Sequence, residues 1–337
     1  VSTDYTKIFI FFFIFSASSF FLQSIFSLAF SKKFQRKKIW GYIGNTATKS
    51  ILEENLTESR VFCELKFFHL NKNKFTFEGL LIEDLDTLES EEFEEILLLK
   101  ENGVQILSPL QWSEKYIQRY PPELIKTYSN LFENLNFAEK QFTLRIKRLG
   151  DITFSIFLIL LSLPVLLFSS LLIMIEDGGP ILYSQTRTGL KGKPFRIYKL
   201  RTMVNKAEKK GPKWSTYNDP RITKTGRLLR KFRIDELPQL WSVMKGEMSL
   251  IGPRPERPEF DKKLENEIPY YRLRNILRPG LSGWAQVNYH YGATKLDSKN
   301  KLSFDLFYIK NISLLIDFLI MFKTIKTIIY GEGSNPK

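Results

Sequence analysis

The chain has 337 residues, and its 50 Lys and Arg outnumber 36 Asp and Glu to give a formal net charge of +14. This excess predicts a polyanionic partner or an anionic membrane surface. No helix-turn-helix, zinc-finger or ribonucleoprotein motif is found, and 29 Phe in long apolar runs favour lipid over nucleic acid. One cysteine, Cys63, excludes a disulfide framework and indicates a reducing compartment.

The first segment of note is residues 8–30, IFIFFFIFSASSFFLQSIFSLAF, which carry no charge. A helix of about 20 apolar residues spans a bilayer. The basic run SKKFQRKK follows, so the positive-inside rule predicts that the rest of the chain is cytoplasmic. A cleaved signal peptide is the alternative, but its charges would precede the apolar run and a small-residue cleavage site would follow. Residues 1–38 are therefore predicted to be a transmembrane anchor with a basic flank.

Residues 39–140 form a segment in which strand and helix patterns alternate. Strands are expected at 40–45, 79–83 and 104–107, and helices at 49–56 and 91–102. Alternation of this kind predicts a small parallel α/β unit. The turn GYIGN lacks the full G-x-G-x-x-G pattern, so a structural turn is favoured over a nucleotide site. We expect a dimerisation or regulatory module without a catalytic role.

A second apolar segment, residues 152–175, is also long enough to cross a membrane. Two crossings would carry the following residues away from the cytoplasm. Pro164, near the middle, removes a helical hydrogen bond, and Ser162 could satisfy a freed carbonyl group. Basic residues flank both ends of the segment. The sequence therefore predicts a helix-break-helix hairpin that enters one leaflet and returns to the same face.

Beyond this hairpin, two strands are expected at 179–185 and 195–200, joined by the basic loop TRTGLKGKP. For Lys191 and Lys193 in this loop, a solvated edge near lipid headgroups is preferred. A basic helix is expected at 225–232. Residues 312–330 are apolar but interrupted by charges, which predicts an amphipathic helix in the membrane interface.

The stretch RIDELPQLWSVMKGEMSLIGPRPER at 233–257 places Asp235 and Glu236 at the start of a short helical pattern that Gly246 can end. A helix N-terminus favours phosphate, and the stiff turn around Arg254 presents a guanidinium fork suited to it. Separately, these residues are ordinary: an N-cap, a first-turn acid and a surface turn. A glycosidase pair is disfavoured because neighbouring side chains on a helix point about 100° apart.

Several blocks between about residues 147 and 330 occur in one order: KRLGD, GPILYSQTRTGLKGKPFRIYKLRTM, NDPRIT, DELPQLWSVMKGEMSLIGPRP and RPGLSGWAQVN. Together they resemble the bacterial sugar transferases, monotopic phosphoglycosyl transferases whose long form carries an N-terminal Rossmann-like module. The resemblance implies an α/β fold with an α+β catalytic domain at 141–333 and a re-entrant helix at 152–175. The family often has Ser directly before the proline, whereas Leu163 stands there in this chain.

The resemblance also implies the reaction. A sugar 1-phosphate passes from a UDP-sugar to undecaprenyl (polyprenyl) phosphate, at the cytoplasmic face of the bacterial inner membrane, to initiate exopolysaccharide, capsule, O-antigen or other glycoconjugate synthesis. Asp235 would be the nucleophile that forms a phosphosugar-aspartyl intermediate. Asp235 and Glu236 would hold Mg²⁺, and Glu236 could instead assist the second attack.

By the same resemblance, the substrate phosphates and nucleotide would contact Gln185, Arg187, Lys199, Arg201, Arg254, Arg278, Gln286 and Asn288. Expected partners are membrane lipids, the donor and the acceptor, but no nucleic acid, and a homodimer is compatible with the sequence. The alternative function is a non-catalytic, membrane-anchored scaffold or regulator that binds anionic lipid or nucleic acid through its charge.

Overall fold

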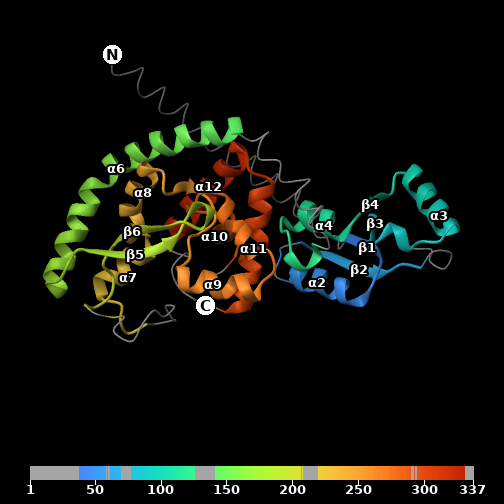
Figure 1. Cartoon of the computed structure of the whole chain (residues 1–337), viewed down its shortest axis with the longest axis horizontal. Coiled ribbons are helices and arrows are strands. Elements are labelled where there is room, and N and C mark those ends of the chain that lie inside the picture. The colour runs from blue at the N-terminus through green and yellow to red at the C-terminus, as the bar shows by residue number, and fades with distance from the viewer. Residues whose placement is uncertain are drawn as a thin grey trace, which may run out of the picture. The chain divides into compact units, whose positions relative to one another are not determined.

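The structure is a computed structural model that describes residues 38–57, 59, 61–69, 77–125, 141–205, 207, 219–289, 292 and 294–330. The chain divides into two compact units, Val1–Ile117 and Gln118–Lys337. Figure 1 shows the elements of each unit. The anchor predicted at 8–30 lies outside the described residues, and so does most of the predicted linker before residue 141. The boundary between the two units falls between residues 117 and 118 in the chain, whereas the sequence prediction places the domain boundary at residue 140.

The first unit is a parallel four-stranded sheet with strand order β2-β1-β3-β4. The strands are β1 (Lys38–Ile43), β2 (Cys63–Phe67), β3 (Gly79–Ile82) and β4 (Gln105–Leu107), and the main helices are α2 (Thr46–Thr57) and α3 (Ser90–Glu101). Short turns of helix complete it: η1 (Leu85–Thr87), α4 (Pro109–Trp112) and η2 (Ser113–Ile117). The predicted parallel α/β unit is confirmed. Strand β2 was not predicted, although CELKF alternates apolar and charged residues as a half-buried strand does.

The core of this sheet depends on one glycine. Trp40, in β1, is buried and packs edge-to-face against Trp112 at 6.1 Å between ring centroids. Gly79 begins the neighbouring strand, and a Cβ atom there would lie 2.3 Å from the Trp40 ring. Any side chain at Gly79 would therefore displace the indole that fills this side of the sheet.

The turn GYIGN between β1 and α2 is closed by a carboxylate from the end of β3. Glu83 accepts hydrogen bonds from the Tyr42 hydroxyl (2.9 Å), the Asn45 backbone N–H (2.8 Å), the Asn45 side-chain amide (2.8 Å) and the Thr48 hydroxyl (3.0 Å). It thus lies at the start of α2, where a nucleotide phosphate would otherwise dock. A second anion there would be repelled, which supports the interpretation of this segment as a structural turn.

The second unit begins with residues that precede the long apolar helix. The Tyr120 N–H donates to the Ser303 carbonyl oxygen (2.9 Å), and the Arg119 guanidinium lies 4.3 Å from the centroid of the Phe304 ring. The Trp284 indole N–H donates to the carbonyl oxygen of Gln118 (3.2 Å). Residues 118–125, which include η3 (Pro122–Leu124), are therefore part of this unit.

The dominant element of the second unit is α6 (Gln141–Asp177), the one helix among the described residues that is long and apolar enough to cross a membrane. It starts before the predicted segment and remains helical through Pro164, so the predicted interruption is absent. Figure 1 shows instead that α6 bends along its length. Proline frees the carbonyl group of Leu160, but the Ser162 hydroxyl donates to the carbonyl oxygen of Ile159 (3.2 Å).

The block KRLGD ties the first turns of α6 to the rest of the unit. Lys147 pairs with Asp317 of α12 (Leu314–Tyr330) at 2.7 Å. Arg148 donates to two carbonyl oxygens in the last turn of α8 (Leu240–Lys245) at 2.7 and 2.9 Å. Asp151 accepts from the Leu250 N–H at 3.0 Å. Three polar residues at helical spacing thus fix the base of an otherwise apolar helix.

The body of the unit contains two small sheets. β5 (Leu182–Thr188) and β6 (Pro194–Leu200) form the expected antiparallel hairpin, and β7 (Ser249–Ile251) pairs in parallel with β8 (Gly280–Ser282). At the second pair, a Cβ atom on Gly252 would lie 2.4 Å from the Arg278 carbonyl oxygen, so GPRP and RPGLSG meet backbone to backbone. The remaining elements are η4 (Leu190–Gly192), α7 (Lys224–Lys231), η5 (Ile234–Gln239), α9 (Pro258–Glu267), η6 (Tyr271–Ile276), α10 (Trp284–Asn288) and α11 (Lys295–Lys310).

Candidate active site

The acidic pair lies in η5, a 3₁₀ helix that runs directly into α8. Arg233 precedes it in a left-handed conformation (φ 52°), and Gly246 (φ 85°) ends α8 as expected. Asp235 and Glu236 are both buried, each with 7% of its surface exposed. Because η5 has only six residues, its dipole is small. Basic side chains must therefore supply most of the positive field at this site.

Three cations hold Glu236. Lys199 Nζ, from β6, lies 2.6 Å from Oε1, and an Arg254 nitrogen lies 2.7 Å from the same oxygen. Arg233 reaches Oε2 at 3.2 Å. Burial alone would raise the pKa of Glu236, but the three cations outweigh burial and hold its pKa well below the usual range. Glu236 is therefore ionised and locked in place.

Asp235 is in the opposite situation. No described residue donates a hydrogen bond to its carboxylate. Burial and the adjacent charge of Glu236 raise the pKa of Asp235, although Lys199 and two arginines partly offset both effects. A buried carboxylate without donors is poorly stabilised and correspondingly reactive toward an electrophile. The pair thus combines one fixed and one free carboxylate.

A second arginine, Arg274, holds the backbone of Arg254. Arg274, in η6, is buried and donates to the Arg254 backbone carbonyl oxygen at 2.8 Å. It also pairs with the buried Asp305 of α11 at 3.1 Å. Burial alone would lower the pKa of Arg274, but Tyr271 and Asp305 outweigh burial and hold its pKa above the usual value. Sequence reasoning missed Arg274 and Arg233, because no local pattern separates a buried, bridging arginine from a surface one.

Gln185 and Arg187, both expected to bind substrate, brace the turn that carries Arg254. Arg187 donates to the Gln185 side-chain oxygen at 2.7 Å and to the Pro255 carbonyl oxygen at 3.2 Å. It also lies 3.6 Å from the Glu256 carboxylate. Burial lowers the pKa of Arg187, and Glu256 partly offsets this. These contacts support the position of Arg254.

The other four expected binding residues have partners elsewhere, and none contacts the acidic pair in the described part of the chain. Arg201 lies 3.2 Å from Asp177 at the end of α6. Arg278 donates through Nε to the Gly246 carbonyl oxygen at 2.9 Å. Gln286 donates to the Leu281 carbonyl oxygen at 3.1 Å, and Asn288 accepts from Lys323 at 2.6 Å.

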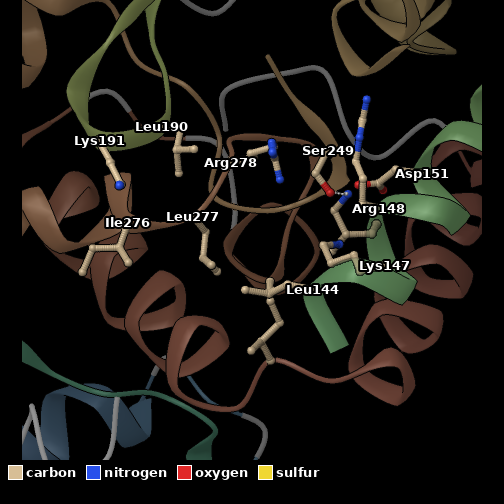
Figure 2. A pocket seen from close by; sticks show the side chains of 12 residues that line it. Leu144, Lys147, Arg148, Asp151, Leu190, Lys191, Ser249, Ile276, Leu277 and Arg278 are labelled. Atoms are coloured by element: carbon tan, nitrogen blue, oxygen red, sulfur yellow. Dashed lines mark hydrogen bonds between the residues drawn. The ribbon is translucent and has the colours of Figure 1, made fainter. Parts of the chain in front are cut away.

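A separate cavity of about 230 Å³ lies beside the first turns of α6 (Figure 2). Neither carboxylate of the acidic pair lines it. Its walls consist of Leu144, Lys147, Arg148, Asp151, Leu190, Lys191, Ser249, Ile251, Ile276, Leu277, Arg278 and Ile312.

The acidic pair has the donor chemistry for Mg²⁺, although the described residues contain no group of three or more potential metal ligands. Mg²⁺ is commonly held by one or two carboxylates, with water and substrate phosphates completing its coordination. The unpaired Asp235 carboxylate fits this role, whereas the oxygens of Glu236 already face three cations.

A free carboxylate beside a cluster of cations, in a unit that carries an exposed apolar helix, is an arrangement that suits phosphate groups near a membrane surface. The comparisons with known proteins agree. The family model for the bacterial sugar transferases matches residues 142–331, and the chain belongs to this family.

Several relatives are named as undecaprenyl-phosphate sugar transferases. The UDP-N-acetylgalactosamine-undecaprenyl-phosphate N-acetylgalactosaminephosphotransferase of Aeromonas hydrophila is 47% identical over 189 residues, which are 56% of this chain and 45% of the relative. A putative undecaprenyl-phosphate N-acetylgalactosaminyl 1-phosphate transferase of Bacillus subtilis (strain 168) is 51% identical over 131 residues, 39% of this chain and 73% of the relative.

A third relative is named for a different sugar. The UDP-glucose:undecaprenyl-phosphate glucose-1-phosphate transferase of Escherichia coli (strain K12) is 38% identical over 182 residues, 53% of this chain and 39% of the relative. The matched region thus spans less than half of two of these three relatives.

Proposed function

We propose that this chain transfers a sugar 1-phosphate from a UDP-sugar to undecaprenyl phosphate through a covalent intermediate on Asp235. The observation that carries the proposal is the unpaired carboxylate of Asp235 beside a Glu236 carboxylate that is bound by Lys199 and Arg254. The names of the relatives support the donor and acceptor classes.

In the first step, an Asp235 carboxylate oxygen attacks the phosphorus that bears the sugar. The bond from that phosphorus to the bridging oxygen breaks, and UMP leaves with this oxygen. A UDP-sugar carries negative charge that repels Asp235, and Lys199, Arg233 and Arg254 offset it. Mg²⁺ bound through the unpaired carboxylate of Asp235 would neutralise further phosphate charge.

In the second step, a phosphate oxygen of undecaprenyl phosphate attacks the same phosphorus. The bond to Asp235 breaks, its carboxylate is restored, and the product is a sugar linked to the lipid through a diphosphate. Two displacements at one phosphorus predict ping-pong kinetics. The three cations keep Glu236 ionised, and the charge of Glu236 in turn holds the three cations at the site through both steps.

The membrane placement is part of the proposal. We propose that α6, which is continuous but bent along its length, enters one leaflet and returns, with the catalytic residues at the cytoplasmic face of the inner membrane. The exposed apolar side chains along α6 and the polar anchors at its base support this placement. The product would initiate an exopolysaccharide or another surface glycoconjugate, and the first unit would serve dimerisation or regulation.

The donor is the first quantity to test. Two relatives are named for N-acetylgalactosamine, so UDP-N-acetylgalactosamine heads a panel that also includes UDP-glucose. The full chain in nanodiscs with Mg²⁺ is mixed with each donor, and UMP release and the intact protein mass are measured. One donor should release UMP and add one phosphosugar mass in the absence of acceptor.

Asp235→Asn should abolish both signals, a loss of at least about 10⁴-fold for a covalent nucleophile. Glu247→Gln is the matched control, because Glu247 is an acid in the same sequence block whose side chain makes no hydrogen bond or ion pair in the described part of the chain. UMP release that survives Asp235→Asn would refute the covalent route. The absence of UMP release with every donor would favour a scaffold.

A further inference from the structure

The cavity beside α6 combines two kinds of wall. Six of its twelve lining residues are Leu or Ile, and four are Lys or Arg. Figure 2 shows Arg278 between the Leu190 and Lys191 loop on one side and Arg148 with Asp151 on the other. A ligand that fits such walls has an anionic group and an apolar chain.

Two of the four cations have N–H donors that make no hydrogen bond with the described residues. Lys147 is paired with Asp317, and Arg148 donates to two carbonyl oxygens. Lys191, by contrast, has no partner among the described residues, and Arg278 uses only its Nε, toward the Gly246 carbonyl oxygen. An ammonium group and the open end of a guanidinium group are donors that suit phosphate oxygens.

The backbone at Lys191 is strained. Lys191 adopts a left-handed conformation with φ 56°, although glycines lie nearby at positions 189 and 192. A lysine in this conformation costs free energy that glycine would avoid, and such strain clusters at ligand sites. The strained turn sets the direction in which the lysine leaves the loop.

The location of the cavity indicates how the apolar chain would leave it. Leu144, Lys147 and Arg148 belong to the first turns of α6, and the apolar residues that follow them on the helix are largely exposed. If α6 lies in the membrane, as proposed above, the cavity is at the level of the lipid headgroups. At about 230 Å³ it is also below the usual range of about 300–1,000 Å³ for drug-sized ligands, which disfavours a whole nucleotide sugar.

We propose that this cavity binds a phosphate group carried by a lipid, with Lys191 and Arg278 as its phosphate donors and the Leu and Ile side chains against the first part of the chain. This assigns Arg278 to the lipid phosphate in place of the nucleotide. The proposal rests on the proposed function only for the membrane placement of α6. The lipid is either the acceptor, held here before its phosphate moves to Asp235 for the second step, or a bulk anionic phospholipid, since both present the same chemistry.

Photocrosslinking of the full chain in neutral phosphatidylcholine nanodiscs tests this assignment. Two probes are compared, each with a diazirine near the phosphate: a short prenyl phosphate, and phosphatidic acid. At least one should label the peptides that contain Leu144 or Leu277. Lys191→Gln combined with Arg278→Gln should reduce this labelling about tenfold or more, as expected for the loss of two charge-assisted contacts. Labelling by the prenyl phosphate alone identifies the acceptor, and labelling by both identifies a general lipid site.

Lys193→Gln is the matched control, because Lys193 is in the same loop but does not line the cavity. It should leave the labelling unchanged. Equal labelling in the double variant and the wild type, or labelling confined to other peptides, would overturn the proposal. UMP release by the wild type is measured in the same nanodiscs. Its absence would count against the proposed transferase and not against the cavity, whose labelling needs no UDP-sugar.

Discussion

Glu83 in the first unit and Glu236 in the second are both acids close to the start of a helix, but their partners differ in kind. Glu83 accepts hydrogen bonds from neutral groups: a tyrosine hydroxyl, two asparagine N–H donors and a threonine hydroxyl. Glu236 is bound by three cations instead. The two sites therefore differ in the sign of their net charge. The Glu83 turn stays anionic, whereas the Glu236 cluster has more positive than negative charge.

This difference explains why only one of the two turns suits phosphate. Neutral donors that are already engaged offer nothing to an incoming anion. The cations around Glu236 are partly exposed, with Arg254 the most open at 35%, and they can share their N–H groups with a second set of oxygens. A glycine-rich turn before a helix is thus a weak indicator of a phosphate site unless the charges that close it are known.

Among the tests of this comparison, the largest effect on turnover is expected when Arg254, the most exposed of the three cations, is replaced. Arg254→Met should lower kcat for UMP release by about 10²–10³-fold, the usual cost of losing one donor to a developing charge. Arg254→Lys should recover only part of this loss, because an ammonium group lacks the two-pronged geometry of guanidinium. Steady-state UMP release in nanodiscs measures both. Full activity of Arg254→Met would mean that Arg254 plays no part in the chemistry.

A smaller effect on turnover is expected for Arg274, which contacts the backbone of Arg254. Arg274 holds the Arg254 backbone and never meets the acidic pair directly. Arg274→Lys should keep the charge beside Asp305 but lose the reach to the Arg254 carbonyl oxygen, lowering kcat about tenfold with little change in KM. Arg272→Lys, at the neighbouring exposed position, is the control. A rise in KM without a fall in kcat would indicate that Arg274 affects substrate binding instead.

The partner of Arg274 predicts a pH effect on stability. Burial raises the pKa of Asp305 to about 6, and Arg274 partly offsets that rise. A folded pKa above the unfolded value of about 3.9 means that the stabilisation is complete at low pH and is lost as the pH rises through about 6. Urea unfolding between about pH 4 and pH 6 should show this loss. Asp305→Asn should flatten the slope, and an unchanged slope would assign it to another group.

The amino-acid sequence predicts the elements better than their contacts. Strands β1, β3 and β4 and helices α2 and α3 follow from local apolar patterns. Strand β2 was missed although its five residues alternate in the same way, because a pattern this short is confirmed as a strand only by its pairing with β1. The packing of residues 118–125 on α11 was equally beyond reach, since it joins positions about 180 residues apart. Long-range contacts of this kind leave no periodic signal in the chain.

The candidate site divides in the same way. The pairing of Lys199 and Arg254 with Glu236 follows the pattern of the family resemblance, which already singled these residues out. Arg201, Gln286 and Asn288 lie within the matching blocks too, yet their side chains have partners away from the acidic pair. A sequence block indicates that a region matters for the fold or the chemistry. Only tertiary contacts show which of the two a particular side chain serves.

The smallest effect on turnover, and the sharpest contrast with Glu236, is expected from Glu83. Glu83→Gln removes a carboxylate that accepts from four donors, and should destabilise the first unit by about 1–3 kcal/mol because hydrogen bonds to the buried Tyr42 and Thr48 side chains are weakened. UMP release per folded molecule should stay unchanged if that unit is not catalytic. Chemical unfolding with hydrogen exchange of β1 and α2 measures the first effect, and active-site titration by the phosphosugar adduct normalises the second. A loss of turnover in folded Glu83→Gln protein would mean that this turn of the first unit affects catalysis.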